Sequence, residues 1–272
     1  MNELSILIVS YNTVGDLERC LDALLQAPPS VSHEIVIIDN ASSDGSQDAV
    51  KSRWPHVRLI PLDTNTGFAR ANNIGFRQTQ SELVLLLNSD TIVPAGAINQ
   101  LVRQMRELPG ASIVGPRLVN GKGAAELSFG PMMSPLAELR QKFLTRAAGQ
   151  ERIDEMTSGL QEVDWVSGAC LLVRRTEAES AGLLDERYFM YCEDVDFCAA
   201  IRSRGGRVYF TPVTEVIHLK GRSAQVDRQA TAAAYRKSHL AFYKKHHPGW
   251  VPILRLYLAV QGKLPKESAD KD

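Results

Sequence analysis

The chain has 272 residues, 44% of them hydrophobic and 23% charged, which is ordinary for a protein with a substantial core. Lys plus Arg and Asp plus Glu both number 31, so the formal net charge is zero and nothing overall suggests a nucleic-acid partner. No apolar run approaches the roughly 20 residues that cross a bilayer, and the first residues lack the basic region of a signal peptide. We therefore expect a cytoplasmic protein whose contact with the inner face of the cell membrane, if any, is peripheral.

Apolar runs and helical patterns alternate over the first 119 residues. Buried strands are predicted at residues 4–9, 34–38, 57–61, 83–87 and 112–115. Helices with one apolar face are predicted at residues 16–25 and 97–107, a short helix is predicted at residues 46–53, and another helix follows residue 67. This β-α-β-α-β order predicts an α/β protein with a doubly wound, mostly parallel sheet.

Two of these strands end in carboxylates. Asp39 follows the second strand, and the central strand ends in Asn88-Ser89-Asp90. The carboxyl ends of parallel strands meet at one edge of the sheet, where ligands bind in open α/β folds. The alternative is that Asn88-Ser89-Asp90 caps a following helix whose first turn contains Pro94. A second acid at the same edge favours a ligand crevice over two helix caps.

A second group of acids begins a helix that is predicted to start near residue 193. Glu193, Asp194 and Asp196 lie in its first turn, directly after the aromatic residues of 188–191. Acids in a first turn complement the helix dipole, which is their structural interpretation. A carboxylate that the aromatic rings desolvate would instead be a better general base. The last predicted strand covers residues 208–212, and residues 216–218 then bring His218 to a strand end, where it is either structural or a metal ligand.

The chain is less regular after residue 119. Patterning is lost from residue 120 to about 161, as in a lid, a binding loop or disorder. Trp165 follows, and it either stacks on a ring of a ligand, such as a sugar if the ligand is one, or belongs to the core. Residues 128–146 and 239–260 are basic and apolar and could form amphipathic helices on an anionic bilayer. The alternative for both is packing against the body of the protein or against a partner in a homodimer.

Several motifs occur in the order that is known from one family: Ile8-Val9-Ser10-Tyr11-Asn12, Asp39-Asn40-Ala41-Ser42-Ser43-Asp44-Gly45-Ser46, Asn65-Thr66-Gly67-Phe68-Ala69, Asn88-Ser89-Asp90, Glu193-Asp194 and His218. Together they resemble family 2 glycosyltransferases of the GT-A fold, and by eye the bacterial rhamnosyltransferases of cell-surface polysaccharide assembly. The resemblance implies a GT-A domain over 1–225, with a nucleotide-sugar half (1–119) and an acceptor half (120–225) that includes the irregular segment 121–162. Residues 226–272 would be a C-terminal helical extension.

The resemblance implies that these residues bind the nucleotide sugar: Ser10, Tyr11, Asn12, Asp39, Asn40, Gly67, Phe68, Arg70, Asn88 and Ser89. Asp39 would hold the base or the ribose, and Arg70 would contact the phosphates or the nucleotide unless it only covers a solvated helix face. Asp90 and His218 would hold the Mg²⁺ or Mn²⁺ ion that bridges the two phosphates. The first acid of the family's acid-x-acid pattern is Asn88 here, so metal affinity would be modest or rest mainly on Asp90.

The implied reaction is an inverting transfer from a dTDP- or UDP-sugar to a saccharide or lipid-linked saccharide, with rhamnose from dTDP-rhamnose as the expected donor. Asp194 is the expected base for the acceptor hydroxyl, and Glu193 is the second choice or a donor-sugar contact. The metal would neutralise charge on the departing diphosphate. The rival functions are a glycoside hydrolase with paired carboxylates, a nucleotidyltransferase and a non-catalytic sugar-nucleotide binding module.

Overall fold

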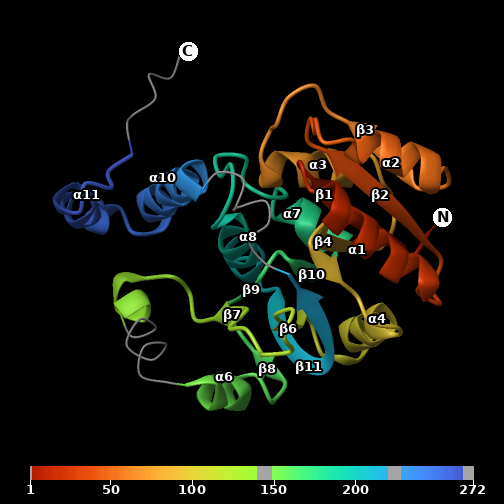
Figure 1. The fold of residues 1–272 in the computed structure, drawn as a ribbon. Coiled ribbons are helices and arrows are strands. Elements are labelled where there is room, and N and C mark those ends of the chain that lie inside the picture. Colours follow the sequence, from red (N-terminus) through yellow and green to blue (C-terminus); the bar gives the residue numbers. More distant parts are fainter. Residues whose placement is uncertain (1, 140–148, 220–227, 266–272) are drawn as a thin grey trace.

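The computed structural model describes residues 2–139, 149–219 and 228–265. Its first part contains, in chain order, β1 (Leu4–Ser10), α1 (Val14–Gln26), β2 (His33–Asp39), α2 (Ser46–Arg53), β3 (Arg58–Pro61), α3 (Phe68–Arg77), β4 (Leu83–Asn88), β5 (Thr91–Ile92), α4 (Ala97–Glu107) and β6 (Ala111–Val119). Its second part contains β7 (Phe129–Gly130), α6 (Gln150–Met156), β8 (Gln161–Glu162), β9 (Trp165–Val166), β10 (Cys170–Arg174), α7 (Arg175–Ser180), α8 (Glu193–Arg202) and β11 (Arg207–His218). The chain continues with α10 (Arg228–His246), the 3₁₀ helix η1 (Pro248–Trp250) and α11 (Val251–Val260), as Figure 1 shows.

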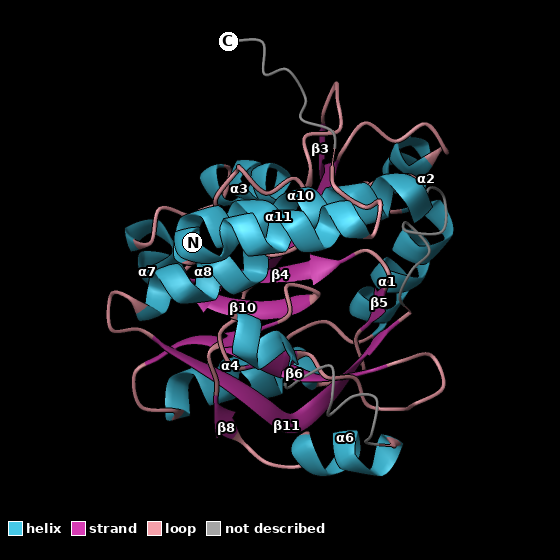
Figure 2. Cartoon of the chain, turned by 90° about the vertical axis from the view of Figure 1, so that its left-hand side faces the viewer, coloured by secondary structure: helices cyan, strands magenta, loops and turns pink. Residues whose placement is uncertain are grey.

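Nine described strands form one sheet, in the order β3-β2-β1-β4-β10-β6-β11-β5 with β8 paired to β11 (Figures 1 and 2). Strands β1 to β4 are parallel to one another, and β6 is parallel to β11. Strand β10 is antiparallel to both of its neighbours and joins the two parallel parts. The predicted α/β sheet is therefore confirmed. The last strand, β11, is one long irregular strand that includes the last predicted strand and His218.

The central strands are apolar on both faces because each face is covered by helices. Alternate residues of β1 enter different cores: Ile6 packs with the apolar faces of α1 and α4, whereas Leu7 packs with those of α3 and α8. This alternation is the two-residue period of a strand with both faces buried. Asp39, Asn88 and Asp90 are thus held by the most deeply buried part of the molecule.

The structure corrects one alternative that the sequence left open, because Asn88-Ser89-Asp90 does not cap a helix. Asn88 ends β4, and the residues directly after Asp90 form β5, which pairs with the end of β11 so that Thr91 lies opposite His218. The helix α4 begins later, after a glycine cap. Asp90 therefore lies between two strands, and this pairing is what brings His218 beside it.

Helix α10 is attached to the rest of the described chain through a buried acid. Asp196 of α8 contacts Lys245 Nζ at 2.8 Å, His246 Nε2 at 2.6 Å and the Tyr188 hydroxyl at 3.2 Å. Phe242, on the same helix as Lys245, is fully buried in a third core with Tyr188. These contacts attach α10 to the helix that carries Glu193 and Asp194.

The basic segment at 239–260 is not one amphipathic helix. Pro248 begins the short 3₁₀ helix that separates α10 from α11, and α10 packs on the body as in the structural alternative. Lys245, one of its bases, is paired with Asp196 instead of a lipid. In the segment 128–146, residues 140–146 lie outside the described residues. Within the described ranges no helix has the length and apolar composition needed to cross a bilayer.

Candidate active site

The polar residues at the ends of β1, β2 and β4 share one edge of the sheet. Ser10 lies opposite Asp39 in the register of β1 and β2, and Val9 lies opposite Asn88 in that of β1 and β4. The Ser10 hydroxyl is 3.2 Å from the Thr13 hydroxyl, which is 3.0 Å from the hydroxyl of Ser89. Ser10 and Ser89 therefore connect the loops that carry the site, and Thr13, which the sequence analysis missed, is the link between them.

Asp39 has one satisfied oxygen and one free oxygen. Its Oδ2 accepts hydrogen bonds from the Ser42 backbone N–H at 2.9 Å and from Gln47 Nε2 at 2.8 Å. Its Oδ1 is buried and has no hydrogen-bond partner among the described residues. A buried acceptor without a donor costs free energy, so this oxygen fits a donor on a ligand, such as a nucleobase N–H or a ribose hydroxyl. Gln47, not expected from the sequence, fixes the carboxylate.

Asn40, Gly67 and Phe68 hold the loop before α3 in place. Asn40 Oδ1 accepts the Thr66 backbone N–H at 2.8 Å, and its Nδ2 donates to the Gly67 carbonyl at 3.2 Å. The Phe68 N–H donates to the Phe189 carbonyl at 2.7 Å, across to the segment that precedes α8. The side-chain amide of Asn40 is thus engaged with this loop, which connects the predicted donor side to the predicted catalytic side.

The other predicted donor residues are more accessible. Tyr11 is exposed, and Asn12, with a φ of 52°, accepts the Ser43 backbone N–H on its side chain at 2.8 Å. Arg70 is exposed on α3, where its Nε lies 3.8 Å from Glu186 Oε2. An exposed arginine that is weakly paired can turn toward a phosphate, but these contacts also suit a solvated helix face.

The predicted metal ligands lie together. His218 Nε2 is 3.3 Å from Asp90 Oδ1 and 3.5 Å from Asn88 Nδ2, while its Nδ1 is 3.7 Å from Glu126 Oε2. Burial alone would lower the pKa of His218, but the two carboxylates outweigh it and raise that pKa to about 9. Glu126 is an unexpected neighbour because it lies in the irregular segment, where no spacing marks it.

These residues fit a hard divalent cation that takes most of its ligands from a diphosphate. One carboxylate and one imidazole, which must first give up its proton to the solvent, offer two protein ligands, which suits Mg²⁺ or Mn²⁺ bound largely by phosphate oxygens. Within 2–139, 149–219 and 228–265, no three His, Cys, Asp or Glu side chains are arranged as a complete metal site.

Glu193 and Asp194 begin α8 as the sequence predicts, but their surroundings differ. Asp194 accepts the Gly168 backbone N–H on Oδ2 at 3.0 Å and the Val195 N–H on Oδ1 at 2.9 Å. Burial raises the pKa of Asp194, and the two hydrogen bonds, which lower it, only partly offset this effect. Glu193 is more deeply buried, and its Oε2 has no hydrogen-bond partner in the part of the chain that is described. Burial, and then the charge of Asp194, raise the pKa of Glu193 well above the usual value.

The two halves of the site meet around Gly168 and Tyr191. A Cβ atom on Gly168 would lie 3.4 Å from both the Phe68 ring and the Asp194 side chain, so the backbone of this glycine lies beside both. Tyr191 has a φ of 70°, which is uncommon outside glycine and concentrates at functional sites. Burial raises the pKa of Tyr191, and the charges of Glu193 and Asp90 raise it further.

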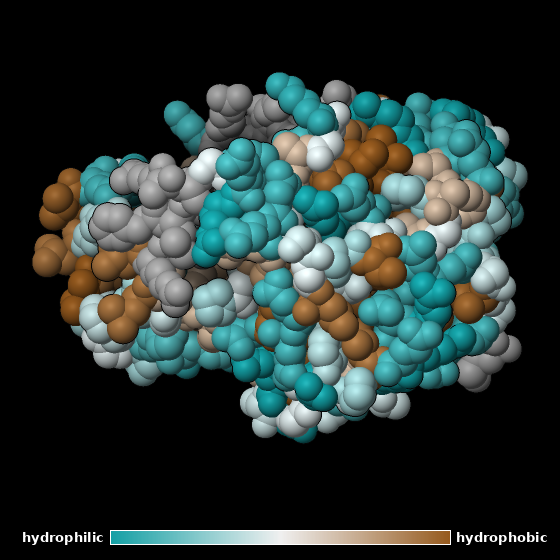
Figure 3. All heavy atoms as spheres, turned by 90° about the horizontal axis from the view of Figure 1, so that it is seen from below, coloured by the Kyte–Doolittle hydropathy of each residue, from teal (hydrophilic) through white to brown (hydrophobic). Residues whose placement is uncertain are grey.

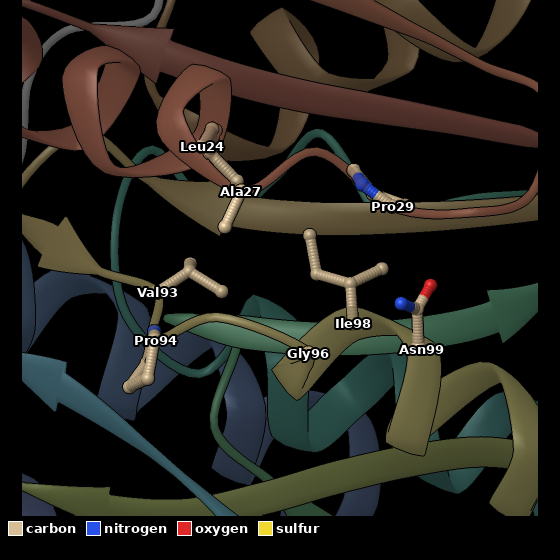
Figure 4. A pocket seen from close by; sticks show the side chains of 8 residues that line it. All are labelled: Leu24, Ala27, Pro29, Val93, Pro94, Gly96, Ile98 and Asn99. Atoms are coloured by element: carbon tan, nitrogen blue, oxygen red, sulfur yellow. The ribbon is translucent and has the colours of Figure 1, made fainter.

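Trp165 and a small cavity lie apart from the residues described above. Trp165 donates its indole N–H to the Pro131 carbonyl at 3.0 Å and packs between two cores, as in its structural interpretation. The small cavity in Figure 4 lies between the end of α1 and the start of α4 and contains none of the predicted site residues. One of the side chains around it, Asn99, is already bonded to the backbone N–H and hydroxyl of Ser30.

The raised pKa of Glu193 predicts a pH-dependent cost in stability. A carboxyl with a raised pKa in the folded state stabilises the fold fully below its unfolded pKa, near 4.5, and loses that contribution as pH rises through the folded pKa. Glu193→Gln should therefore raise the melting temperature above that of the wild type at pH 7 to 8. Each pKa unit corresponds to about 1.4 kcal/mol. Thermal unfolding across pH tests this: a gain that is the same at pH 4 and pH 8 would contradict it.

The family model described as "Glycosyl transferase family 2" matches residues 5–168 of this chain. The chain is 32% identical over 268 residues to the N-acetylglucosaminyl-diphospho-decaprenol L-rhamnosyltransferase of Mycobacterium tuberculosis, covering 91% of this chain and 86% of that protein. It is also 27% identical to the low-salt glycan biosynthesis hexosyltransferase Agl10 of Haloferax volcanii, covering 80% of this chain and 67% of that one.

Solved structures share the fold. The mannosyltransferase PcManGT from Pyrobaculum calidifontis, solved with GDP-Man and Mn²⁺, has a TM-score of 0.61 and 20% identity, covering 97% of this chain and 72% of that chain. GalNAc-T7, solved with UDP, GalNAc and Mn²⁺, has a TM-score of 0.60 and 17% identity, covering 99% and 60%. The expected GT-A type fold is confirmed. With the family model over more than half of the chain, these findings show that this protein belongs to glycosyl transferase family 2 and is a glycosyltransferase.

Proposed function

We propose that the protein transfers L-rhamnose from dTDP-rhamnose to a hydroxyl of a saccharide or lipid-linked saccharide, with inversion at the anomeric carbon. The observation that carries the reaction class is the set of three acids, Asp39, Asp90 and Asp194, held at the ends of buried elements of a family 2 fold. The name of the mycobacterial relative supports rhamnose and a lipid-linked acceptor. Residues 1–119 would hold the donor, residues 120–225 the acceptor and the base, and residues 226–272 would be an extension.

The donor would be oriented by Asp39. Its buried Oδ1 is free to accept a hydrogen bond from the base or ribose, while Gln47 and the Ser42 N–H keep the carboxylate in place. The loop that contains Gly67 and Phe68 then extends toward α8, so that a bound nucleotide would present its sugar to the acids there.

The diphosphate would be held near Asp90 and His218. A Mg²⁺ or Mn²⁺ ion bound by these two side chains would neutralise charge on the departing diphosphate. Asn88 contributes an amide where the family pattern has an acid, so it can donate a hydrogen bond to a phosphate oxygen and adds no negative charge. That arrangement leaves Asp90 as the main anionic ligand.

The acceptor would be activated by Asp194. Its carboxylate takes the proton of the acceptor hydroxyl while the hydroxyl oxygen bonds to the anomeric carbon, and the bond from that carbon to the diphosphate oxygen breaks with its electron pair on the diphosphate. The Gly168 N–H orients Asp194, and burial raises its pKa, which makes it a stronger base than an exposed aspartate. Glu193, whose pKa is raised further, stays protonated over a wider range and can donate a hydrogen bond to the sugar.

Calorimetric titration with dTDP, UDP and GDP, each with and without Mn²⁺, tests the donor site. We expect dTDP to bind in the presence of Mn²⁺, and we expect Asp90→Asn to weaken that binding by roughly 10- to 100-fold or more. Losses of this size are typical when a residue that only hydrogen-bonds to a metal ligand is replaced, and Asp90 would be a ligand itself. Asp22→Asn makes the same chemical change on the exposed face of α1 and should leave binding unaltered. Binding of none of the nucleotides would contradict the proposal, and a preference for UDP or GDP would replace the donor.

A further inference from the structure

An unusual apolar surface covers the last described helix. Ile253, Leu256, Tyr257 and Val260 are all exposed and recur on α11 at intervals of three and four residues, so they lie along one face. Leu256 is 67% and Val260 80% exposed, although a leucine and a valine normally lie in a core. Only Leu258 of this helix is buried among the described residues. A continuous stripe of this kind indicates an interaction site, whereas single exposed apolar residues do not.

A second segment extends the same surface. Residues 135–139 form a short helical turn, which carries Leu136, 75% exposed, and Leu139, also exposed. Glu138 of this turn accepts hydrogen bonds at 2.8 Å from both His239 and Tyr243, so the turn is fastened to α10. In Figures 1 and 2 the turn and α11 lie on the same side of the molecule, and Figure 3 shows apolar side chains gathered at that end.

The segment that carries α11 is basic, and the adjoining turn contains one acid, Glu138, which is bonded to His239 and Tyr243. Residues 228–265 contain seven Lys or Arg and no Asp or Glu, in a chain whose formal net charge is zero. Trp250 and Tyr257, both exposed, add aromatic side chains that favour the boundary between water and lipid. A basic segment with an apolar stripe and aromatic residues has the composition of a helix that lies in the plane of an anionic membrane surface.

We propose that α11 and the 135–139 turn, which we call the α11 surface, bind the surface of an anionic bilayer. A second copy of the chain is the less suitable occupant, because two such surfaces would bring like charges together. Only the biological role of this binding rests on the proposed function, since an enzyme bound to the membrane surface would meet a lipid-linked acceptor there. The binding itself requires neither a nucleotide nor catalysis.

Vesicle flotation tests the proposal with the full-length protein. At low salt the protein should float with phosphatidylglycerol vesicles, bind phosphatidylcholine vesicles much more weakly and be partly released by added salt. Replacing Ile253 and Leu256 together by Gln should weaken binding by roughly tenfold or more for each side chain removed from lipid. Leu160→Gln makes the same change at another exposed leucine, 49% exposed and outside the α11 surface, and should have no effect.

Three results would overturn the proposal. The first is that the wild type does not float with phosphatidylglycerol vesicles at low salt, and the second is that the double variant floats as well as the wild type. The third is a concentration-dependent dimer that the double substitution abolishes, which would assign the surface to a second copy of the chain. Circular dichroism and dTDP titration of the double variant show that it is folded. Because flotation needs no donor, failure of dTDP to bind would remove the proposed donor and leave this inference standing.

Discussion

Asp194→Asn should lower the kcat of sugar transfer by roughly 10²- to 10⁴-fold, the contribution of a positioned general base. An acceptor hydroxyl is a weak nucleophile at neutral pH, and asparagine has nearly the same shape as aspartate but cannot take its proton. The amide oxygen can still accept the Gly168 N–H, and only the bond from the adjacent Val195 N–H is lost, so the start of α8 should keep its position. The Kd for dTDP in the presence of Mn²⁺ should therefore stay close to that of the wild type.

Transfer rates and calorimetric titration of the same preparation check this prediction. Glu151→Gln, which removes the charge of an exposed acid in the first turn of α6, provides the control and should retain full activity. The pH profile adds a second readout. Because burial raises the pKa of Asp194, kcat/KM of the wild type should fall on the acidic side at a higher pH than an ordinary aspartate would give. Equal losses of transfer and of nucleotide binding in the variant would assign Asp194 a structural role instead.

Gly67→Ala should destabilise the fold by roughly 3 kcal/mol or more and weaken nucleotide binding as well. Gly67 has a φ of +82° and a ψ of 177°, a conformation that is essentially restricted to glycine and costs about 1–3 kcal/mol for other residues. A Cβ atom there would also lie 2.3 Å from the Phe189 carbonyl oxygen, so the backbone would have to move. Any such movement disturbs the hydrogen bond from Phe68 to Phe189 that connects the donor loop to the α8 side.

A second glycine separates the two causes. Gly96 has a φ of +78°, and a Cβ atom there would meet no other atom within 4 Å, so Gly96→Ala adds backbone strain without a collision. We expect Gly96→Ala to cost about 1 kcal/mol and to leave dTDP binding unchanged. Urea unfolding and dTDP titration of both variants measure this. Equal unfolding free energies for the two variants would show that the contact with Phe189 does not constrain the loop.

Much of the architecture follows from the sequence alone, because a strand that is buried on both faces appears in the sequence as a short, continuous apolar run. The apolar runs at β1, β2 and β4 and the helical spacing between them predict parallel strands, and their polar ends at Asp39 and Asp90 then have to share an edge. The start of α8 at Glu193 is local as well, since acids before an apolar helical face mark a first turn.

The tertiary structure decided what each polar residue does, because that depends on partners that are far away in the chain. Asp90 is followed by a strand and not by a helix because β5 pairs with β11, more than a hundred residues later, and the same pairing brings His218 to it. The neighbouring acids on α8 also have different partners. Asp194 meets the Gly168 N–H, Glu193 is buried with a free oxygen, and Asp196 binds Lys245 and His246 of α10. The three acids lie within one turn of the same helix, so the sequence pattern does not separate them, and only the groups packed around each one determine its role.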